Sequence, residues 1–507
     1  MKQVYNHVAI AGKGIANGLT GSVKAPIVEG ETKTYSNYIN VSGNALTTNL
    51  DQLSVVAMLI NKTTGAVVNA DKRAVKVVDN FPVNSATIGA FDMATAVLGG
   101  TTTVSVPMKS VGRAGVKSID YTVRAGANES ELMHVELAEP IKGIGVSRYV
   151  DFQIPADTIT GIVTRSVLLK KVNGEENESK QSTSASGKLM TIAKESPRKT
   201  VIEEYTGTWC MWCCRGIAGL KRAHDEYPND IVLMAIHSGS GNSSDPMQNS
   251  VFNTVISGHN FPSADVNRYR AVDPYIGEGT EGWGLGKVIE DEQKKLAEAG
   301  VNLSTPILDE ATGVINFTTD VTFQINRRNA PYLLSYVLIG DGLTGTTSDW
   351  TQVNAYSIYA GSYDDDPYMK EITEWPVYVE GLVYDHVALN ALGISSGLTG
   401  SLKNRVEEGQ VQSHSTQFNI KNQTLAKKAT KLYVAAMVYD RDRKCFINAD
   451  VKEVVSSTVG INTADMKAGE LVEVARFTAD GKRISHAQKG LNIVRMSDGT
   501  VRKVMVR

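Results

Sequence analysis

The sequence has little of what marks a membrane-spanning or nucleic-acid-binding chain. Its 507 residues carry 52 Lys and Arg against 54 Asp and Glu, a formal net charge of -2. A balanced charge of this kind provides no basic surface for a polyanion. No apolar run approaches the roughly 20 residues that a membrane-spanning helix needs. We therefore expect no nucleic-acid partner and no transmembrane helix.

Cysteine is also scarce, with four residues in the whole chain, three of them between positions 210 and 214. So few cysteines exclude a small fold that is held together by disulfide bonds. Cys445 stands alone, and we expect it to be a small, half-buried side chain. An export signal is missing as well, because residues 1–6 do not lead into an apolar segment with a cleavage site.

The chain does contain a long internal repeat. The matched segments keep a constant offset of 379 residues and need no gap: residues 4–9 with 383–388, 14–22 with 393–401, 55–58 with 434–437, and 69–71 with 448–450. Strand-like segments at residues 321–325 and 332–338 precede the second copy, whereas three residues precede the first. We expect the first copy to be truncated at its start, which also accounts for the missing export signal. The alternative is a short sheet that a neighbouring domain completes.

Alternating apolar and polar residues predict β-structure over most of the chain. Short alternating runs between residues 81 and 168, punctuated by Gly and Pro, are typical of an immunoglobulin-like sandwich. Residues 170–186 are rich in Lys, Glu, Asn and Ser and are expected to form a solvated linker. The pattern then changes to strand, helix, strand and closing helix, at residues 200–205, 213–227, 231–236 and 284–299. This order predicts a parallel α/β sheet.

The expected fold is therefore multidomain and mostly β, with one α/β domain flanked by β-sandwich domains. The expected units are a partial β-sandwich module at 1–80, an immunoglobulin-like β-sandwich at 81–169, a linker and lead-in strand at 170–195, the α/β domain at 196–300, a β-sandwich at 301–459 and a small β-unit at 460–507. In the last unit, strands are connected by Asp-Gly turns at Asp480-Gly481 and Asp498-Gly499.

The residues that carry chemistry gather where the first strand of the α/β domain gives way to a helix. Cys210 and Cys213 stand there at CxxC spacing. The N–H groups and dipole of a helix N-terminus stabilise a thiolate, so that a cysteine pKa falls from about 8.5 to roughly 3.5–7.5. The pattern predicts a thioredoxin-like redox centre, with Cys210 as the nucleophile and Cys213 as the resolving thiol. Cys214 cannot easily pair with Cys213, because a disulfide between adjacent residues is strained.

Two further residues are candidates for this site. Glu204 lies six residues before Cys210, and a carboxyl buried beneath the dithiol could accept the proton that Cys213 loses during resolution. The alternative is a surface glutamate, in which case Glu203 takes the inner face. Pro262 precedes a predicted strand, and a cis bond there would offer a strand edge to an extended substrate opposite the cysteines. An ordinary trans turn proline is the alternative.

Metal binding is the rival chemistry. Three thiolates together with Met211 form a soft set that suits Cu(I) or Zn(II). Zinc sites prefer a second Cys or His pair at a characteristic spacing, which His224 and His237 do not provide. We expect no metal, and no cofactor beyond a redox-active disulfide between Cys210 and Cys213. A structural CxxC without turnover is the third interpretation.

The cysteines belong to a longer motif, which is Thr206, Gly207, Thr208, Trp209, Cys210, Met211, Trp212 and Cys213, followed by Arg215 and Gly216. With this motif the chain resembles the Omp-twenty-eight-related outer membrane proteins of Bacteroides-type bacteria, whose thioredoxin-like domain carries TGTWCxWC. Residues 261–268 are similar to the cis-proline loop of that family, and residues 349–354 to a recurrent stretch of its β-domain. The resemblance spans residues 86–459 and implies supporting roles for Trp209, Trp212, Cys214 and Arg215.

Two positions depart from the family pattern. Cys214 stands where family members carry proline, and Met211 where they carry glycine. The dipeptide between the cysteines helps to set the reduction potential, which spans roughly −270 to −120 mV across thioredoxin-like proteins. The direction of redox activity therefore stays open, and the third thiol could trap the centre in an unproductive bond.

Residues 461–507 are similar to the C-terminal sorting signals of the type IX secretion system, with a strand, an Asp-Gly turn, a Gly-led strand and a final basic, hydrophobic strand. This resemblance implies a gram-negative protein of the outer membrane, the cell surface or the secreted fraction. Such a compartment is oxidising and favours a Cys210–Cys213 disulfide at rest.

Two classes of function follow from these features. The first is an exported thiol–disulfide oxidoreductase whose clients are protein or peptide thiols and disulfides, with cell-surface or secretion machinery as further partners. The second is a non-catalytic binding or adhesion protein in which the thioredoxin-like domain is an inert scaffold. An exposed Cys210 sulfur above an acid favours the enzyme, whereas a covered CxxC and an exposed aromatic groove on the sandwiches favour the binder.

Overall fold

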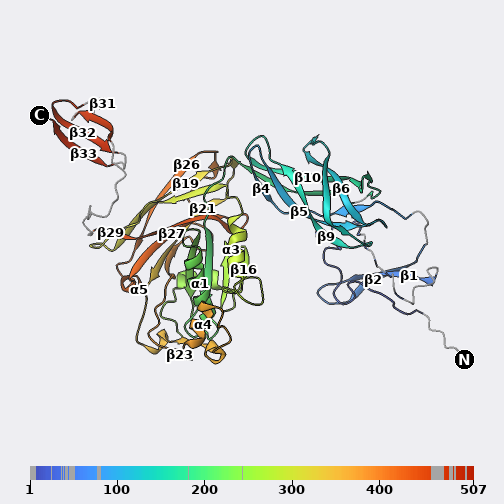
Figure 1. The fold of residues 1–507 in the computed structure, drawn as a ribbon, viewed down its shortest axis with the longest axis horizontal. Helices are drawn as coiled ribbons and strands as arrows, with labels where there is room; N and C mark the ends of the chain where they lie inside the picture. Colours follow the sequence, from blue (N-terminus) through green and yellow to red (C-terminus); the bar gives the residue numbers. More distant parts are fainter. Residues whose placement is uncertain are drawn as a thin grey trace.

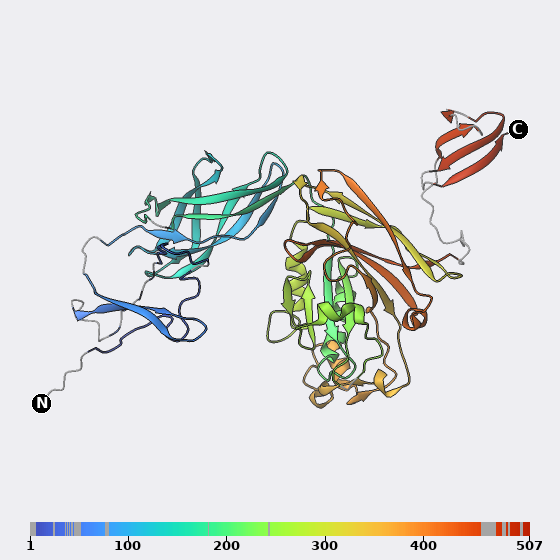
Figure 2. The same ribbon diagram turned by 180° about the vertical axis from the view of Figure 1, so that it is seen from behind.

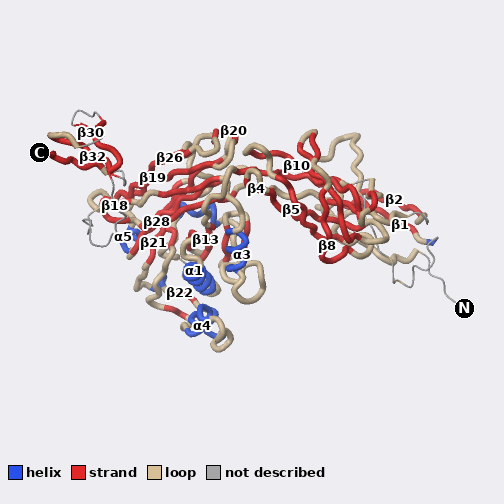
Figure 3. Tube along the Cα trace, turned by 45° about the horizontal axis from the view of Figure 1, so that its top comes forward, coloured by secondary structure: helices blue, strands red, loops and turns tan. Residues whose placement is uncertain are grey.

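The computed structural model describes residues 7–506 apart from 24–25, 36, 38, 40, 42–43, 45–51, 77–80, 181, 242–243, 458–472, 479–482, 485–486 and 497–499. The described chain is mostly β, with several sheets and few helices, as the sequence predicts (Figures 1 and 3). In this part of the chain no helix is long and apolar enough to cross a membrane. The expected Asp-Gly turns at 480–481 and 498–499 and the first repeated residues, 4–6, lie outside the described residues.

A β-sandwich forms between residues 86 and 192. Its larger sheet has the order β4 (Ala94–Val97), β12 (Ser184–Ile192), β10 (Gly161–Val172), β6 (Val116–Ala125) and β7 (Asn128–Glu129), with β8 (Met133–Ile141) beside β6 and β11 (Glu175–Glu176) beside β10. The smaller sheet contains β3 (Ala86–Ile88), β5 (Thr101–Ser110) and β9 (Ser147–Pro155). Alternation sends one face of each strand into a shared core, which includes Val106, Tyr121 and Phe152.

The segment that the sequence predicts as a linker belongs to this sandwich. β10 continues to Val172, and β12 runs from Ser184 to Ile192 in the middle of the larger sheet. Leu189 and Met190 are fully buried, so that this strand is held by its apolar side chains. The charged and polar residues that suggested a linker occupy the short connection between the two strands.

An eight-stranded sheet is the centre of the second large unit. Its order is β16 (Arg270–Val272), β15 (Ser263–Val266), β13 (Thr200–Thr206), β14 (Ile231–His237), β24 (Val387–Leu392), β21 (Tyr332–Asp341), β27 (Lys431–Asp440) and β28 (Cys445–Glu453). β13 and β14 are parallel, as the sequence predicts, and β15 is antiparallel to β13. The helices α1 (Cys214–Glu226) and α3 (Leu285–Gln293) lie beside these strands (Figures 1 and 2). Leu220 of α1 and Val288 of α3 share one apolar cluster with Ile202 and Leu233 of the sheet.

The residues expected as separate domains at 196–300 and 301–459 share this sheet and its core. β14 is linked to β24 through the parallel pair Ala235 and Val387. Val201 from the first segment and Met437 from the second lie in one apolar cluster. The predicted helix at 284–299 is also shorter, because Ala299 begins β17 (Ala299–Leu303). The α/β part is therefore one end of a larger structure.

A second sheet packs against the far end of the eight-stranded one. It contains β17, β19 (Val314–Phe323), β18 (Ile307–Asp309) and β29 (Val455–Ser456) in that order, with β26 (Val411–Asn419) beside β19. Phe317 and Phe418 of this sheet meet Tyr336 of β21 in the largest core of the molecule. Short elements complete this unit: η3 (Ser250–Phe252), α2 (Asn253–Ile256), β20 (Arg327–Arg328), β25 (Arg405–Val406) and α5 (Thr424–Lys428).

Two small sheets lie at the ends of the described chain (Figure 1). The hairpin of β1 (Ser54–Ile60) and β2 (Val67–Ala74) falls within the first copy of the repeat. Near the other end, β31 (Arg483–Ile484), β30 (Glu473–Thr478), β32 (Gly490–Met496) and β33 (Val501–Val506) form a four-stranded sheet in that order.

Candidate functional site

The CxxC turn connects β13 to α1. Cys213 directly precedes the first helical residue, Cys214, and its N–H donates to the Cys210 carbonyl at 3.1 Å. The Cys210 N–H donates in turn to the Gly207 carbonyl at 3.0 Å. Cys210 and Cys213 are joined in a disulfide bond. The structure thus brings the two predicted redox residues together at the N-terminus of α1, where a helix favours a thiolate.

The disulfide is nearly enclosed, while the two residues between its cysteines are exposed. Cys210 keeps 5% of its surface accessible and Cys213 none, whereas Met211 and Trp212 are 47% and 41% exposed. A reagent that reaches this bond therefore meets Cys210 first. The order of exposure is the one that a nucleophile and a resolving cysteine require.

The cover over the turn comes from residues 349–355, far along the chain. Backbone N–H groups of Val353 and Ala355 donate to the carbonyls of Thr208 and Met211 at 2.9 and 2.8 Å. The Gln352 side chain donates to the Cys210 carbonyl at 3.0 Å. The sequence marks this stretch only through the family resemblance, because two of these three hydrogen bonds come from the backbone and leave no side-chain signature.

The two adjacent glutamates of β13 are both buried, on opposite faces of the sheet. Glu203 forms a two-pronged ion pair with Arg268, with N–O distances of 2.6 and 2.7 Å. Glu204 has no ion pair in the described structure, and its Oε1 has no hydrogen-bond partner. Burial raises the pKa of Glu204 to about 7, although the charge of His237 and a hydrogen bond with Thr206 act in the opposite direction. Glu204 is thus a buried acid and not a surface residue.

Glu204 reaches the first turn of α1 because a glycine faces it. The N–H of Gly216 donates to the Cys213 carbonyl at 2.8 Å. A Cβ at position 216 would lie 1.9 Å from Glu204 Oε1, so any side chain there would displace the carboxyl. Gly216 was noted in the motif, but its role in admitting the acid was not predicted.

A buried histidine and aspartate lie on the same side of the site. His237 ends β14, and its Nδ1 is 2.8 Å from Asp245 Oδ2. Asp245 also accepts hydrogen bonds from the N–H groups of Thr208 and Met247. Burial opposes the charge of Asp245, but His237 and these hydrogen bonds hold its pKa below the usual value. The pair anchors the CxxC turn, a role that the sequence did not predict for either residue.

The other predicted residues surround the turn. Pro262 follows a cis bond, and Phe261 packs against Trp209 with ring centroids 5.5 Å apart. Trp212 packs edge-on against Tyr356 at 5.5 Å. Arg215 forms an ion pair with Asp273 at 2.6 Å and donates to the Tyr356 hydroxyl.

Neither remaining thiol is placed for exchange. Cys214 is fully buried, and its thiol lies 3.4 Å from the Val353 carbonyl. Burial raises the pKa of Cys214 to about 12 and that of Cys445 to about 11, so both stay protonated at neutral pH. Among the described residues no group of three or more His, Cys, Asp and Glu side chains is arranged to hold a metal ion.

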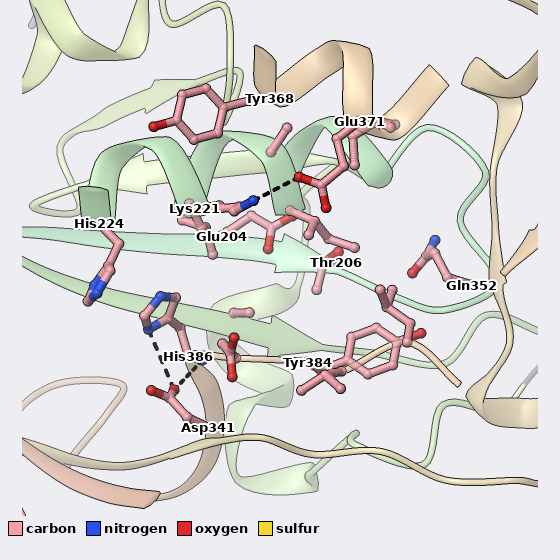
Figure 4. Close-up of a pocket in the computed structure, with 18 of the residues that line it drawn as sticks. Glu204, Thr206, Lys221, His224, Asp341, Gln352, Tyr368, Glu371, Tyr384 and His386 are labelled. Atoms are coloured by element: carbon pink, nitrogen blue, oxygen red, sulfur yellow. Dashed lines mark hydrogen bonds and ion pairs between the residues drawn. The ribbon is translucent and has the colours of Figure 1, made fainter. Parts of the chain in front are cut away.

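A cavity of about 660 Å³ extends from Glu204 between α1, α4 (Pro367–Glu374) and the sheet (Figure 4). Lys221 of α1 pairs with Glu371 of α4 at 2.7 Å on one side of it. His386 lies near Asp341 on the opposite side. Glu204 is therefore one of the residues that line the space between α1, α4 and the sheet.

Comparisons with known proteins give distant similarities. No family model matches the sequence, and no curated protein matches it. Among solved structures, HBP35 of Porphyromonas gingivalis is 15% identical, with 62% of this chain and 99% of that chain covered and a TM-score of 0.35. A protein of Agrobacterium tumefaciens is 11% identical, with 51% and 96% covered and a TM-score of 0.28. A CARDB domain from Pyrococcus furiosus is 12% identical, with 22% and 99% covered and a TM-score of 0.17. These values leave the resemblance to the Omp-twenty-eight-related family a prediction.

Proposed function

We propose that the chain is a thioredoxin-like thiol–disulfide oxidoreductase that acts on protein or peptide thiols and disulfides. The observation that carries the proposal is a disulfide at the N-terminus of α1 with a buried, unpaired carboxyl under the first turn of that helix. The element order supports it, because β13–α1–β14 followed by β15–β16–α3 is the arrangement of a thioredoxin-like core. We assign Cys210 as the attacked sulfur and Glu204 as the proton carrier.

The disulfide form oxidises a client dithiol in two steps. A client thiolate attacks the Cys210 sulfur, a mixed disulfide forms, and Cys213 leaves as a thiolate that takes the proton of Glu204. The second client thiolate then attacks the client sulfur of the mixed disulfide. A client disulfide forms, Cys210 leaves as a thiolate, and two electrons have passed from client to protein. Read in reverse, the same steps reduce a client disulfide, and Glu204 then accepts the proton of Cys213.

The acid is matched to this task by its pKa of about 7. A group with this pKa is both a usable acid and a usable base near neutral pH. The resolving step in the reducing direction needs the carboxylate form of Glu204. Its rate should therefore rise as pH increases through about 7.

The test uses the whole chain, because β14 pairs with β24 and residues 196–300 share their core with later strands. Reduction of insulin disulfides should be measured with the reduced protein and with Cys210→Ser, Cys213→Ser and Glu204→Gln variants. We expect Cys210→Ser to abolish exchange, Cys213→Ser to accumulate mixed disulfide, and Glu204→Gln to slow resolution by about 10²-fold and remove the rise near pH 7.

Glu371→Gln is the matched control, since Glu371 lines the same cavity but is exposed and paired with Lys221. It should leave the pH profile unchanged. Because the raised pKa of Glu204 means that its charged form opposes folding, Glu204→Gln should not lose stability at pH 8. A protein whose disulfide resists dithiothreitol, or whose Cys210→Ser variant exchanges as well as the wild type, would contradict the proposal.

The alternative is a binding protein with an inert disulfide. The 5% exposure of Cys210 and the cover from residues 349–355 favour it. Insulin reduction together with oxidation of a dithiol peptide separates the two, because an inert scaffold shows exchange in neither direction.

We further propose that the protein acts in the bacterial envelope or at the cell surface. This rests on the resemblance of residues 461–507 to a sorting signal, and the strands β30, β32 and β33 lie within that segment. Removal of residues 460–507 should retain the protein inside cells of a type IX secreting host, as measured by fractionation. Unchanged surface exposure would contradict this location.

A further inference from the structure

The segment between β21 and β24, residues 342–386, builds the surface beside the disulfide. It contains η4 (Ser348–Trp350), β22 (Gln352–Val353), η5 (Ala355–Tyr359), α4 and β23 (Tyr378–Val379). Besides the hydrogen bonds to the CxxC turn, it is held to α1 by the Lys221–Glu371 ion pair and by a hydrogen bond from Tyr368 to Asp225. We call this segment the insert.

The insert is far more acidic than the rest of the chain. It carries eight Asp and Glu residues and one lysine, whereas the whole sequence is nearly balanced. Some of these acids are used internally, such as Asp366, which caps α4. Four others are exposed on the insert: Asp364, Asp365, Glu374 and Glu380. The segment that covers the disulfide therefore carries a net negative charge.

Six exposed apolar side chains lie on the CxxC turn and on the insert. The members and their exposed fractions are Met211 (47%), Trp212 (41%), Ile358 (77%), Tyr359 (39%), Val377 (46%) and Tyr378 (66%). Their backbones are tied together, since Ala355 donates to Met211, Asn354 donates to Val377, and Val353 pairs with Tyr378. Large apolar side chains exposed on two segments that are hydrogen-bonded together are a candidate interaction site. We call these six residues the apolar platform.

We propose that the apolar platform and the exposed acids of the insert bind an extended, basic polypeptide whose cysteine is flanked by apolar or aromatic residues. This inference rests on the proposed function and names its client class. The disulfide fixes the occupant, because a partner seated on Met211 and Trp212 must present a sulfur to Cys210. A small disulfide would need only that sulfur and would leave the remaining platform uncovered.

The negative charge of the insert favours clients with a positive charge. Negative charge around a site raises the local concentration of basic partners and suppresses acidic ones, and salt weakens the effect. Apolar contact with Ile358 and Tyr378 would supply affinity, and the acids would supply discrimination. The narrow access to Cys210 adds to this, since an extended segment enters more easily than a folded loop.

The experiment uses the full chain in its reduced form and three peptides of equal length. Each peptide carries one cysteine as a mixed disulfide with thionitrobenzoate, and the flanks are apolar with lysine, apolar with glutamate, or glycine and serine. Glutathione disulfide is the small substrate. Release of thionitrobenzoate is followed in a single turnover. We expect the apolar lysine peptide to react with the highest second-order rate constant, and we expect added salt to reduce the difference between its rate constant and that of the glutamate peptide.

An Ile358→Ser/Tyr378→Ser double variant should lower the rate constant for the apolar lysine peptide by about tenfold and leave that for glutathione disulfide within about twofold. The matched control is Ile159→Ser/Tyr149→Ser, which removes an equally exposed isoleucine and tyrosine from the first sandwich. It should change neither substrate. Glu374→Gln/Glu380→Gln should reduce the preference for lysine over glutamate flanks.

Binding of the same peptides with serine in place of cysteine, measured by fluorescence anisotropy, separates the two proposals. The client class would be overturned if all peptides reacted and bound equally, or if the double variant behaved as the wild type. Exchange with glutathione disulfide would still support the proposed function in that case. Selective binding without any exchange would overturn the proposed function and keep the platform as a peptide-binding site.

Discussion

Residues 54–74 and 433–453 carry matched sequences and fold into matched hairpins, β1–β2 and β27–β28. Met58 pairs with Ala70 as Met437 pairs with Ala449, and both hairpins shift register at the equivalent point, after Leu59 and after Val438. The preceding turns agree as well, since the Gly18 N–H donates to the Gly14 carbonyl at 2.9 Å and the Gly397 N–H to the Gly393 carbonyl at 2.8 Å. All four glycines have positive φ values, which glycine adopts without strain.

The two copies of the hairpin differ in how far other parts of the chain bury them. β27 pairs with β21 as well as with β28, and Val434 and Met437 are fully buried. β1 pairs only with β2 among the described residues, and Val55 and Met58 are 48% and 41% exposed. Local sequence thus reproduces turns, register and bulge, whereas burial depends on strands that other parts of the chain supply.

The largest expected difference between the copies is in the cost of a core deletion. Met437→Ala removes a fully buried side chain and should lower the free energy of unfolding by about 2–5 kcal/mol. Met58→Ala should change it by less than about 0.5 kcal/mol. Urea denaturation followed by tryptophan fluorescence measures the first, because all five tryptophans lie between Trp209 and Trp375. Circular dichroism in the same titration follows the hairpin. Equal effects would mean that the first copy is buried in solution.

A smaller difference is expected at the matched asparagines. Asn448 donates to the carbonyls of Pro197 and Ala299, both at 2.8 Å, and accepts from the Lys199 N–H. Asn448→Ala leaves these buried groups unsatisfied and should cost about 1–3 kcal/mol. Among the described residues, the Asn69 side chain accepts only the N–H of Ala70, and it lies in an exposed hairpin. Asn69→Ala should therefore change the free energy of unfolding by no more than about 0.5 kcal/mol. Unchanged hydrogen exchange at the Lys199 amide in the Asn448 variant would argue against this role.

The matched histidines provide the smallest and most specific test. Burial lowers the pKa of His386, with Asp341, Asp385 and Asp225 opposing this and His224 reinforcing it. The His386 side chain therefore binds a proton more weakly in the folded state than in the unfolded chain. Protonation of His386 should therefore not reduce the free energy of unfolding above pH 6.5, and it should reduce it increasingly as pH decreases below that value.

Asparagine tolerates the φ of 59° at both histidines, so His386→Asn and His7→Asn are suitable variants. His386→Asn should flatten the slope of unfolding free energy against pH between 5 and 6.5 by up to about 1.4 kcal/mol per pH unit. His7→Asn replaces the matched histidine, whose side chain is exposed, and is the control. An equal slope in both variants would remove His386 as the cause.

The sequence was informative about the site wherever neighbours in the chain decide the geometry. The β13–turn–α1 order follows from apolar patterning and from the CxxC spacing. The cover over the site could not be read in the same way, because Val353 and Ala355 contact the turn through their backbones. The eight-stranded sheet shared by residues 196–300 and 301–459 could not be predicted either. Periodicity identifies the apolar face of a strand but not the strand that lies beside it. A strand was predicted within residues 170–195, but its place in the sheet of the first sandwich was not, because the charged connection before it suggested a linker.

The eight-stranded sheet has a consequence for how this protein could have been assembled in evolution. A recombination breakpoint near residue 300 would strip β14 of its β24 neighbour and expose Val201 and Met234, which pack with Val337 and Met437. Such a product would have an unpaired strand edge that is prone to aggregation. The stretch from β13 to β28 should therefore be inherited as a single cassette, while the hairpin and the terminal sheet are free to be gained or lost.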